Sequence, residues 1–183
     1  TDFALFVSLF PQLVAGPIVR ASEIGPQLRR KRPFRWPRFS WGLYLILLGF
    51  FHKCVLADNL SRVVDPFFEG VDGTESFGES WLAVYAFAAQ IYCDFAGYSW
   101  IAIGIAYLLG WRFPSNFQLP YLATSFRDFW RRWHMTLSRF LRDYLYIPLG
   151  GNRGGPSKTH RNLMITMILG GLFFGRGQPF LRG

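Results

Sequence analysis

Two long segments with almost no charge constrain what this sequence can fold into more than any other feature. They cover residues 41–57 and 81–110. Apolar runs approaching twenty residues are long enough to cross a bilayer, whereas soluble cores are built from shorter amphipathic patterns. We therefore predict an all-α fold: a multi-span helical integral membrane protein with spans at about 41–57 and 81–110.

The charged residues lie between these segments and predict the topology. The chain has 20 Lys and Arg against 11 Asp and Glu, and the cations gather in residues 20–38 and 111–161. Residues 58–79 hold six acidic side chains and one cation, Arg62. The positive-inside rule places the basic segments 20–38 and 111–161 in the cytoplasm, the second of them partly amphipathic, and makes 58–79 an external loop.

The basic stretch at 29–38 interleaves cations with aromatic rings, a composition that can bind nucleic acid. Pro33 and Pro37 would interrupt a recognition helix there, and a nucleic-acid binder would leave the uncharged segments unexplained. We expect no nucleic-acid partner. Contact with anionic lipid headgroups is the better interpretation of a basic stretch beside a membrane span.

Several segments are expected to depart from simple spans. Pro11 and Pro17 interrupt the apolar residues 3–19, which favours a re-entrant element. One helix over 81–110 would reach about 45 Å across a hydrocarbon core of about 30 Å, so we expect strong tilt or a break at Gly97. We further predict an amphipathic helix at 124–146, a glycine-rich turn at 150–155 and a short apolar segment at 162–175.

A carboxylate inside an apolar segment is a candidate functional group. Asp94 lies deep in the second segment, with Gln90 and Tyr98 one helical turn away on either side. A charge at this depth is costly and signals a polar cavity or a buried partner. The pattern predicts a polar lumen and leaves a structural network and a catalytic role equally open.

His134 is the most informative of the three histidines. A helix around it would place Trp130 and Trp133 near the same face, where a neutral imidazole can act as a general base. Arg127 and Arg131, four residues apart, can hold anionic groups such as phosphates. The alternative is an amphipathic interfacial helix whose arginines contact lipid phosphates.

Other kinds of site are not indicated. His52 is expected near the membrane interface and His160 in a solvated loop. The sequence has no Gly-x-Ser-x-Gly elbow, no Walker loop and no zinc-ligand spacing. We therefore predict no metal and no bound cofactor.

Five stretches carry a specific pattern: residues 10–20, 90–99, 112–117, 128–138 and 142–153. The most specific, 128–138, is Asp-Phe-Trp-Arg-Arg-Trp-His-Met-Thr-Leu-Ser. On these stretches the chain resembles the membrane-bound O-acyltransferase family, in particular the bacterial branch that includes alginate O-acetyltransferase. The resemblance implies that residues 1–183 are a fragment of a single membrane domain.

That resemblance implies a helical core with a tunnel joining the two faces of the bacterial cytoplasmic (inner) membrane. A cytoplasmic acyl donor, acetyl-CoA or an acyl carrier, would supply acetyl groups for hydroxyls of an extracellular polysaccharide such as alginate. Membrane lipid, the polysaccharide and accessory periplasmic acetyltransferases are the expected partners. Transfer of D-alanyl groups to teichoic acid is an alternative, as is a non-catalytic membrane or transport subunit.

On positions that match the family, the resemblance implies that His134 is catalytic. The candidates for lining the tunnel or contacting substrate are Gln90, Asp94, Tyr98, Asn116, Arg127, Asp128, Trp130, Arg131, Arg132, Asp143 and Asn152.

The sequence departs from the family at an important position. A second family histidine, the usual base that activates the acceptor hydroxyl, belongs to a Gly-Gly-Leu-Trp-His-Gly motif. Here residues 170–175 are Gly-Gly-Leu-Phe-Phe-Gly, with Phe174 in its place. Phenylalanine cannot accept a proton, so we expect the chain as written to be inactive, and unstable alone. A smaller departure is Trp100, where relatives commonly carry Asp.

The tail at 176–183 offers an explanation for this departure. Codons for Arg176 to Pro179, shifted by one base, can encode Gly-Ala-Asn, close to the residues after Trp-His in the family. We hypothesise a frameshift near Leu172, and we expect both chain ends to be truncations.

Overall fold

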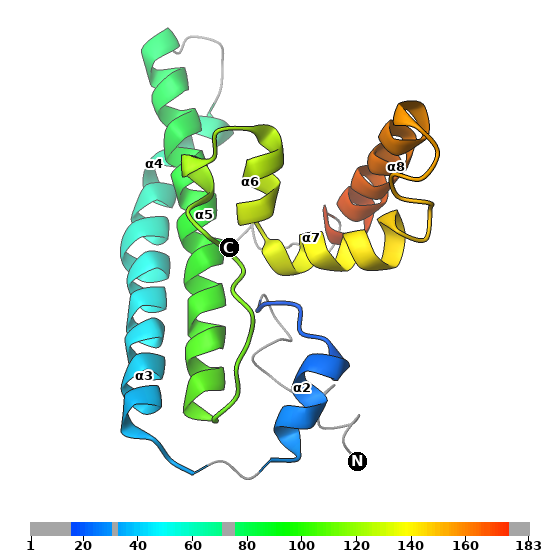
Figure 1. Ribbon diagram of the computed structural model, residues 1–183. Helices are drawn as coiled ribbons and strands as arrows, with labels where there is room; N and C mark the ends of the chain where they lie inside the picture. The colour runs from blue at the N-terminus through cyan, green and yellow to red at the C-terminus, as the bar shows by residue number, and fades with distance from the viewer. Residues whose placement is uncertain (1–15, 31–32, 71–75, 176–183) are drawn as a thin grey trace. The chain divides into compact units, whose positions relative to one another are not determined.

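The computed structural model describes residues 16–30, 33–70 and 76–175, with side chains to residue 172. Within these ranges the chain forms helices and no strand, which confirms the all-α prediction (Figure 1). The predicted re-entrant element at 3–19 lies mostly outside them. The elements are α2 (Ala21–Leu28), α3 (Trp36–Phe50), the π-helix η2 (Phe51–Ala57), α4 (Asp58–Glu69), α5 (Phe77–Leu108), η3 (Pro120–Leu122), α6 (Phe126–Arg132), α7 (Met135–Leu141), the π-helix η4 (Arg142–Tyr146) and α8 (Pro156–Gly175).

Two compact units divide the chain, Thr1–Gln118 and Leu119–Gly183, and each is described by itself. In the first unit, α3, η2 and α4 form one continuous helix of 34 residues, Trp36–Glu69. The second long helix is α5, with 32 residues. Both are long and apolar enough to cross a membrane, and in the described part of the chain they are the two such helices. They contain most of the two predicted spans.

The predicted external loop is wrong over its first half, because Asp58–Glu69 is the helix α4. The acidic residues do not break the helix, and Val64, on the side that faces the neighbouring helix, is 1% exposed. The ring of Phe68 lies 5.4 Å from that of Phe87 on α5. At 1.5 Å per residue the continuous helix reaches about 51 Å, so α4 extends the helix beyond a hydrocarbon core of about 30 Å.

Of the two alternatives predicted for 81–110, strong tilt or a break at Gly97, the break is wrong, because α5 is unbroken from Phe77 to Leu108. A capping box fixes its start: Ser76 N–H donates to Glu79 Oε2 at 2.8 Å, and Glu79 N–H donates to Ser76 Oγ at 3.3 Å. Glycine at position 97 serves contact between helices rather than a kink.

The long helices pack backbone to backbone at two pairs of glycines. A Cβ atom at Gly42 would lie 2.9 Å from the carbonyl oxygen of Gly104, and one at Gly97 would lie 2.7 Å from that of Gly49. The glycines are seven residues apart on each helix, so both pairs match in an antiparallel register. Small residues that let backbones approach closely are typical of contacts between membrane helices.

The two basic segments meet at one end of this helix pair. Gln27 of α2 donates through Nε2 to the Arg112 carbonyl at 3.2 Å and accepts from Arg112 N–H at 2.9 Å. Arg38 Nη1 donates to the Gly110 carbonyl at 3.1 Å. An apolar cluster that includes Ile24 and Phe113 packs beneath them. The chain entering α3 and the chain leaving α5 are thereby held together.

The second unit corrects the predicted helix at 124–146. That segment is divided into α6, α7 and η4. Trp133 is extended, and His134 has φ 43°, in the left-handed region. The predicted glycine-rich turn is confirmed, with positive φ at Gly150, Gly151, Gly154 and Gly155. The predicted apolar segment at 162–175 belongs to the longer helix α8.

Candidate functional site

Asp94 has a charged partner, one of the two alternatives that its position in an apolar segment left open. Its Oδ1 lies 2.6 Å from Nζ of Lys53, and the same Nζ lies 3.1 Å from Asp58 Oδ1. The three residues come from α5, η2 and α4. Sequence reasoning missed Lys53 as a site residue, although a lysine in an apolar span is itself a signal for an acidic partner.

Gln90 and Tyr98 flank this ion pair on α5. At about 100° per residue, positions 90, 94 and 98 lie within about 80° of one another around the helix axis. The three side chains therefore project from one face of α5. Gln90 Oε1 is buried and accepts no hydrogen bond from any residue that the structure describes. The predicted polar lumen stays a prediction, and the unpaired amide oxygen is the feature that a hydroxyl or water would satisfy.

The π-helix η2 carries both Lys53 and His52. His52 Nδ1 lies 2.9 Å from the Leu48 carbonyl oxygen, and its ring meets the indole of Trp100 edge-on with centroids 4.5 Å apart. Trp100 is one of the two departures from the family pattern. It therefore packs against a histidine instead of presenting a carboxylate. π-Helical turns are frequent at functional sites because they change which side chains face inward.

Asn116 is buried at 1% exposure and donates through Nδ2 to Ser99 Oγ at 3.1 Å. This bond ties the segment that follows α5 back onto α5. Phe117 adds an edge-on contact to Phe95, with ring centroids 5.0 Å apart. The geometry gives Asn116 a role in positioning the backbone.

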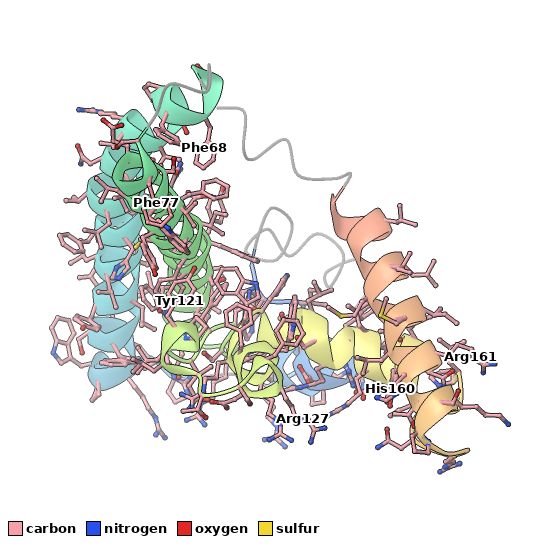
Figure 2. All side chains as sticks on the ribbon, turned by 90° about the horizontal axis from the view of Figure 1, so that it is seen from above. Phe68, Phe77, Tyr121, Arg127, His160 and Arg161 are labelled. Atoms are coloured by element: carbon pink, nitrogen blue, oxygen red, sulfur yellow. The ribbon has the colours of Figure 1, made fainter. Side chains whose placement is uncertain are left out.

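The helix α6 carries four charged candidate residues, of which two form an ion pair and two are exposed. Ser125 caps the helix by accepting from Asp128 N–H at 3.1 Å. Arg132 Nε lies 3.0 Å from Asp128 Oδ2, and this hydrogen bond lowers the pKa of the carboxyl group. Arg127 and Arg131 are exposed, and Figure 2 shows Arg127 on the outer side of the helix. Two guanidinium groups are thus accessible to an anionic ligand.

Aromatic rings surround the end of α6. Phe129 stacks on Trp133 at 5.5 Å and 15°, and Tyr121 stacks on Phe129 at 6.4 Å. Trp130 meets Phe129 edge-on at 5.7 Å. Its Nε1 is buried and has no hydrogen-bond partner in the described part of the chain.

His134 separates α6 from α7. The predicted common face of Trp130, Trp133 and His134 on one helix is wrong, because α6 ends at Arg132. Burial lowers the pKa of His134 to about 4, so the imidazole is neutral at pH 7. Its backbone carbonyl accepts from Ser138 N–H at 3.0 Å. A neutral imidazole can accept a hydrogen bond from a substrate hydroxyl, although at this pKa it is a weak base.

The remaining candidates surround the glycine-rich turn. Asp143 Oδ1 lies 2.7 Å from Arg142 Nε, and the Tyr146 hydroxyl donates to Asn152 Oδ1. Sequence reasoning missed Asn162, which is 1% exposed and donates through Nδ2 to the Gly151 carbonyl at 3.1 Å. An asparagine in an apolar helix just after a glycine run was the available signal.

The candidate residues are divided between the two units. Gln90, Asp94, Tyr98 and Asn116 belong to the first, and the others belong to the second. Phe174 lies within α8. Among the described residues no group of three or more His, Cys, Asp or Glu could hold a metal ion.

Two long apolar helices with an internal ion pair, together with a neutral histidine beside exposed arginines, are features of a helical membrane protein with a polar site. A model of the membrane-bound O-acyltransferase family matches residues 1–173, and the chain belongs to that family.

Curated relatives agree with this assignment. The chain is 46% identical over 180 residues to a "Probable alginate O-acetylase AlgI" of Pseudomonas syringae pv. tomato, covering 98% of the chain and 34% of the relative. It is 44% identical over 182 residues to a peptidoglycan O-acetyltransferase of Helicobacter pylori, covering 98% of the chain and 34% of the relative. A teichoic acid D-alanyltransferase of Bacillus subtilis is 28% identical over 148 residues, covering 78% of the chain and 36% of the relative. The chain thus spans about a third of the length of these proteins.

Proposed function

We propose that this chain is part of a multi-pass O-acyltransferase of the bacterial inner membrane that acetylates hydroxyls of an extracellular polysaccharide. The identity of 46% to an alginate O-acetylase over 98% of the chain carries the proposal. The similar identity of 44% to a peptidoglycan O-acetyltransferase supports acetyl transfer to a glycan and leaves the glycan open.

The chemistry requires a base near the acceptor. The base takes the hydroxyl proton while the hydroxyl oxygen attacks the acyl carbonyl carbon. The new C–O bond forms as the C–S bond to a thioester donor breaks, and the donor leaves as a thiol. His134 is neutral and would hold the acceptor hydroxyl by a hydrogen bond. Phe174 cannot take the proton, so the chain as written lacks the second histidine that the family resemblance implies.

The exposed guanidinium groups of Arg127 and Arg131 suit phosphates of the donor, acetyl-CoA or an acyl carrier. Arg132 is already engaged by Asp128. Accessory periplasmic acetyltransferases are proposed to pass the acetyl group to the polysaccharide.

Phe174 favours a second candidate, a non-catalytic membrane subunit that keeps the fold of its relatives. D-Alanyl transfer to teichoic acid has support from more distant relatives, at 28% identity.

The test uses the complete gene in a bacterium whose own polysaccharide O-acetyltransferase has been deleted. Acetyl and D-alanyl esters on surface polymers are measured by NMR, with protein levels in the membrane fraction as the reference. Where the gene encodes Phe174 as written, we expect more acetyl esters from the Phe174→His variant than from the unaltered chain. With a histidine at this position, we expect these esters to be lost when His134→Asn is added. D-Alanyl esters alone would support the alternative transfer. Absence of both esters at normal protein levels would support the non-catalytic subunit.

A further inference from the structure

A cavity lies at the end of the first unit where α3 begins and α5 ends. Its volume is about 180 Å³. These two helix ends are neighbours because the long helices are antiparallel (Figure 1). The walls include Phe34, Arg35, Arg38, Phe39, Tyr107 and Gly110.

The cavity is positively charged. Arg35 and Arg38 line it, and none of its lining residues is acidic. Arg38 is held in place because its Nη1 donates to the Gly110 carbonyl at 3.1 Å. Its other guanidinium donors make no hydrogen bond to the residues that the structure describes. Planar guanidinium groups with free donors match the oxygen atoms of a phosphate.

The surroundings of the cavity fit the headgroup level of a membrane. Phe34 and Trp36 are exposed at 72% and 67%, and Trp36 stacks on Phe39 with ring centroids 5.6 Å apart. Trp41 stacks on Tyr44 further along α3. Aromatic rings of this kind gather at the membrane–water interface. Exposed Leu43 and Leu47 continue along α3 and offer an apolar path for an acyl chain.

We propose that this cavity binds the phosphate of an anionic phospholipid, with Arg35 and Arg38 contacting the phosphate oxygens and the aromatic rings contacting the glycerol and upper acyl carbons. A free phosphate ion would use the two arginines and would gain nothing from the aromatic wall. The bound lipid would fix the end of the helix pair at the membrane surface. This site is independent of the proposed acetyl transfer.

The test uses the complete protein in nanodiscs of phosphatidylcholine with a minor fraction of phosphatidylglycerol. Native mass spectrometry measures the phosphatidylglycerol that the protein retains on release. We expect the Arg35→Gln/Arg38→Gln variant to retain less phosphatidylglycerol by on the order of tenfold, because it lacks both guanidinium groups that would contact the phosphate; this fold-change corresponds to about 1.4 kcal/mol. Arg62→Gln is the matched control, because Arg62 is exposed on α4 at the other end of the helix.

Thermal unfolding in detergent confirms that each variant is folded before lipids are compared. Equal retention by the double variant and the unaltered protein would overturn the proposal. So would equal loss in the Arg62→Gln control, or displacement of the lipid by millimolar inorganic phosphate. Preferential retention of phosphatidylglycerol over phosphatidylcholine, lost only in the double variant, supports it.

Discussion

Lys53 Nζ and Asp94 Oδ1 lie 2.6 Å apart between two helices that are apolar enough to cross a membrane. Without Lys53, the Asp94 carboxylate would be an uncompensated charge between these helices, whereas Lys53 also has Asp58 Oδ1 at 3.1 Å. The ion pair balances the ammonium charge of Lys53 and the carboxylate charge of Asp94 at the contact between the two helices.

The Lys53→Ala variant is expected to lose stability by about 2 kcal/mol. Removing one partner of a fully buried ion pair typically costs about 3–5 kcal/mol of stability. The cost is expected to be smaller here because the Lys53 side chain is 34% exposed. The Lys53→Met/Asp94→Leu double variant should recover most of the loss. Unfolding of the purified complete protein in mixed micelles measures both. A double variant that is as unstable as Lys53→Ala, or less stable, would show that the two side chains are not coupled.

Substitution of Gly49 by alanine is expected to separate the long helices. A Cβ atom there would lie 2.5 Å from the Gly97 carbonyl oxygen, so the backbones must move apart at a cost of about 1–3 kcal/mol. Thermal unfolding in detergent provides the measurement. Gly78→Ala is the control, because nothing lies within 4 Å of a Cβ at that position. Equal melting temperatures for the two variants would argue against the close contact.

His134 is expected to make the stability of the second unit depend on pH. Its pKa of about 4 in the folded protein is below the ordinary value of 6.5, so the unfolded chain binds more protons between these values. Stability should be fully present above pH 6.5 and should fall as the pH drops toward 4. Denaturant unfolding at a series of pH values measures this. The slope should disappear in a His134→Asn variant, and a slope that persists would assign it to other groups.

Asparagine is the replacement chosen for His134 because it tolerates the backbone conformation at this position. His134 has φ 43°, and asparagine tolerates the left-handed region better than most residues. A His134→Asn variant should therefore remain folded while losing acetyl transfer by about 100-fold or more in the complete protein, if the imidazole contacts the acceptor. Ester formation with a soluble hydroxyl acceptor is the measurement. An active His134→Asn enzyme would exclude a catalytic histidine here.

Resequencing of the gene across the codons for 172–183 tests the frameshift hypothesis. We expect a corrected frame to encode Trp-His-Gly in place of Phe173 to Gly175, with further apolar segments after it. An unaltered frame would make Phe174 the true residue and would favour the non-catalytic subunit. Residues 176–183 lie outside the described part of the chain, so DNA is the direct evidence.

The sequence predicted the helical class and the positions of the two long apolar helices, because uncharged segments of that length have few other solutions. It did not predict the ends of the first helix. Charge patterns indicate where the lipid ends, and a helix can continue into water when Val64 and Phe68 pack on a neighbour. The role of Gly97 was also not predicted. A glycine can permit either close packing of two helices or a bend, and the sequence alone does not distinguish the two roles.

The candidate site was predicted unevenly. For Asp94 the sequence left a polar cavity and a charged partner both open, and the identity of Lys53 as its partner depends on the packing of a distant segment. His134 was recognised by its motif, whereas its left-handed backbone between α6 and α7 was not predicted. Pairs close in sequence, such as Asp128 with Arg132, follow from helical spacing alone.

The π-helical segment Phe51–Ala57 changes the spacing of buried residues along the first long helix. On the first long helix, Gly42, Gly49, Ala57 and Val64 are buried. Their intervals are seven, eight and seven residues, so one residue has been accommodated within an otherwise heptad-like seam. A chain lacking one residue of the π-helical turn could keep both flanking contacts with α5 and close into a regular α-helix. A deletion before Lys53 would also turn that side chain by about 100° relative to the start of the helix, so the extra residue affects where the charge lies relative to Asp94.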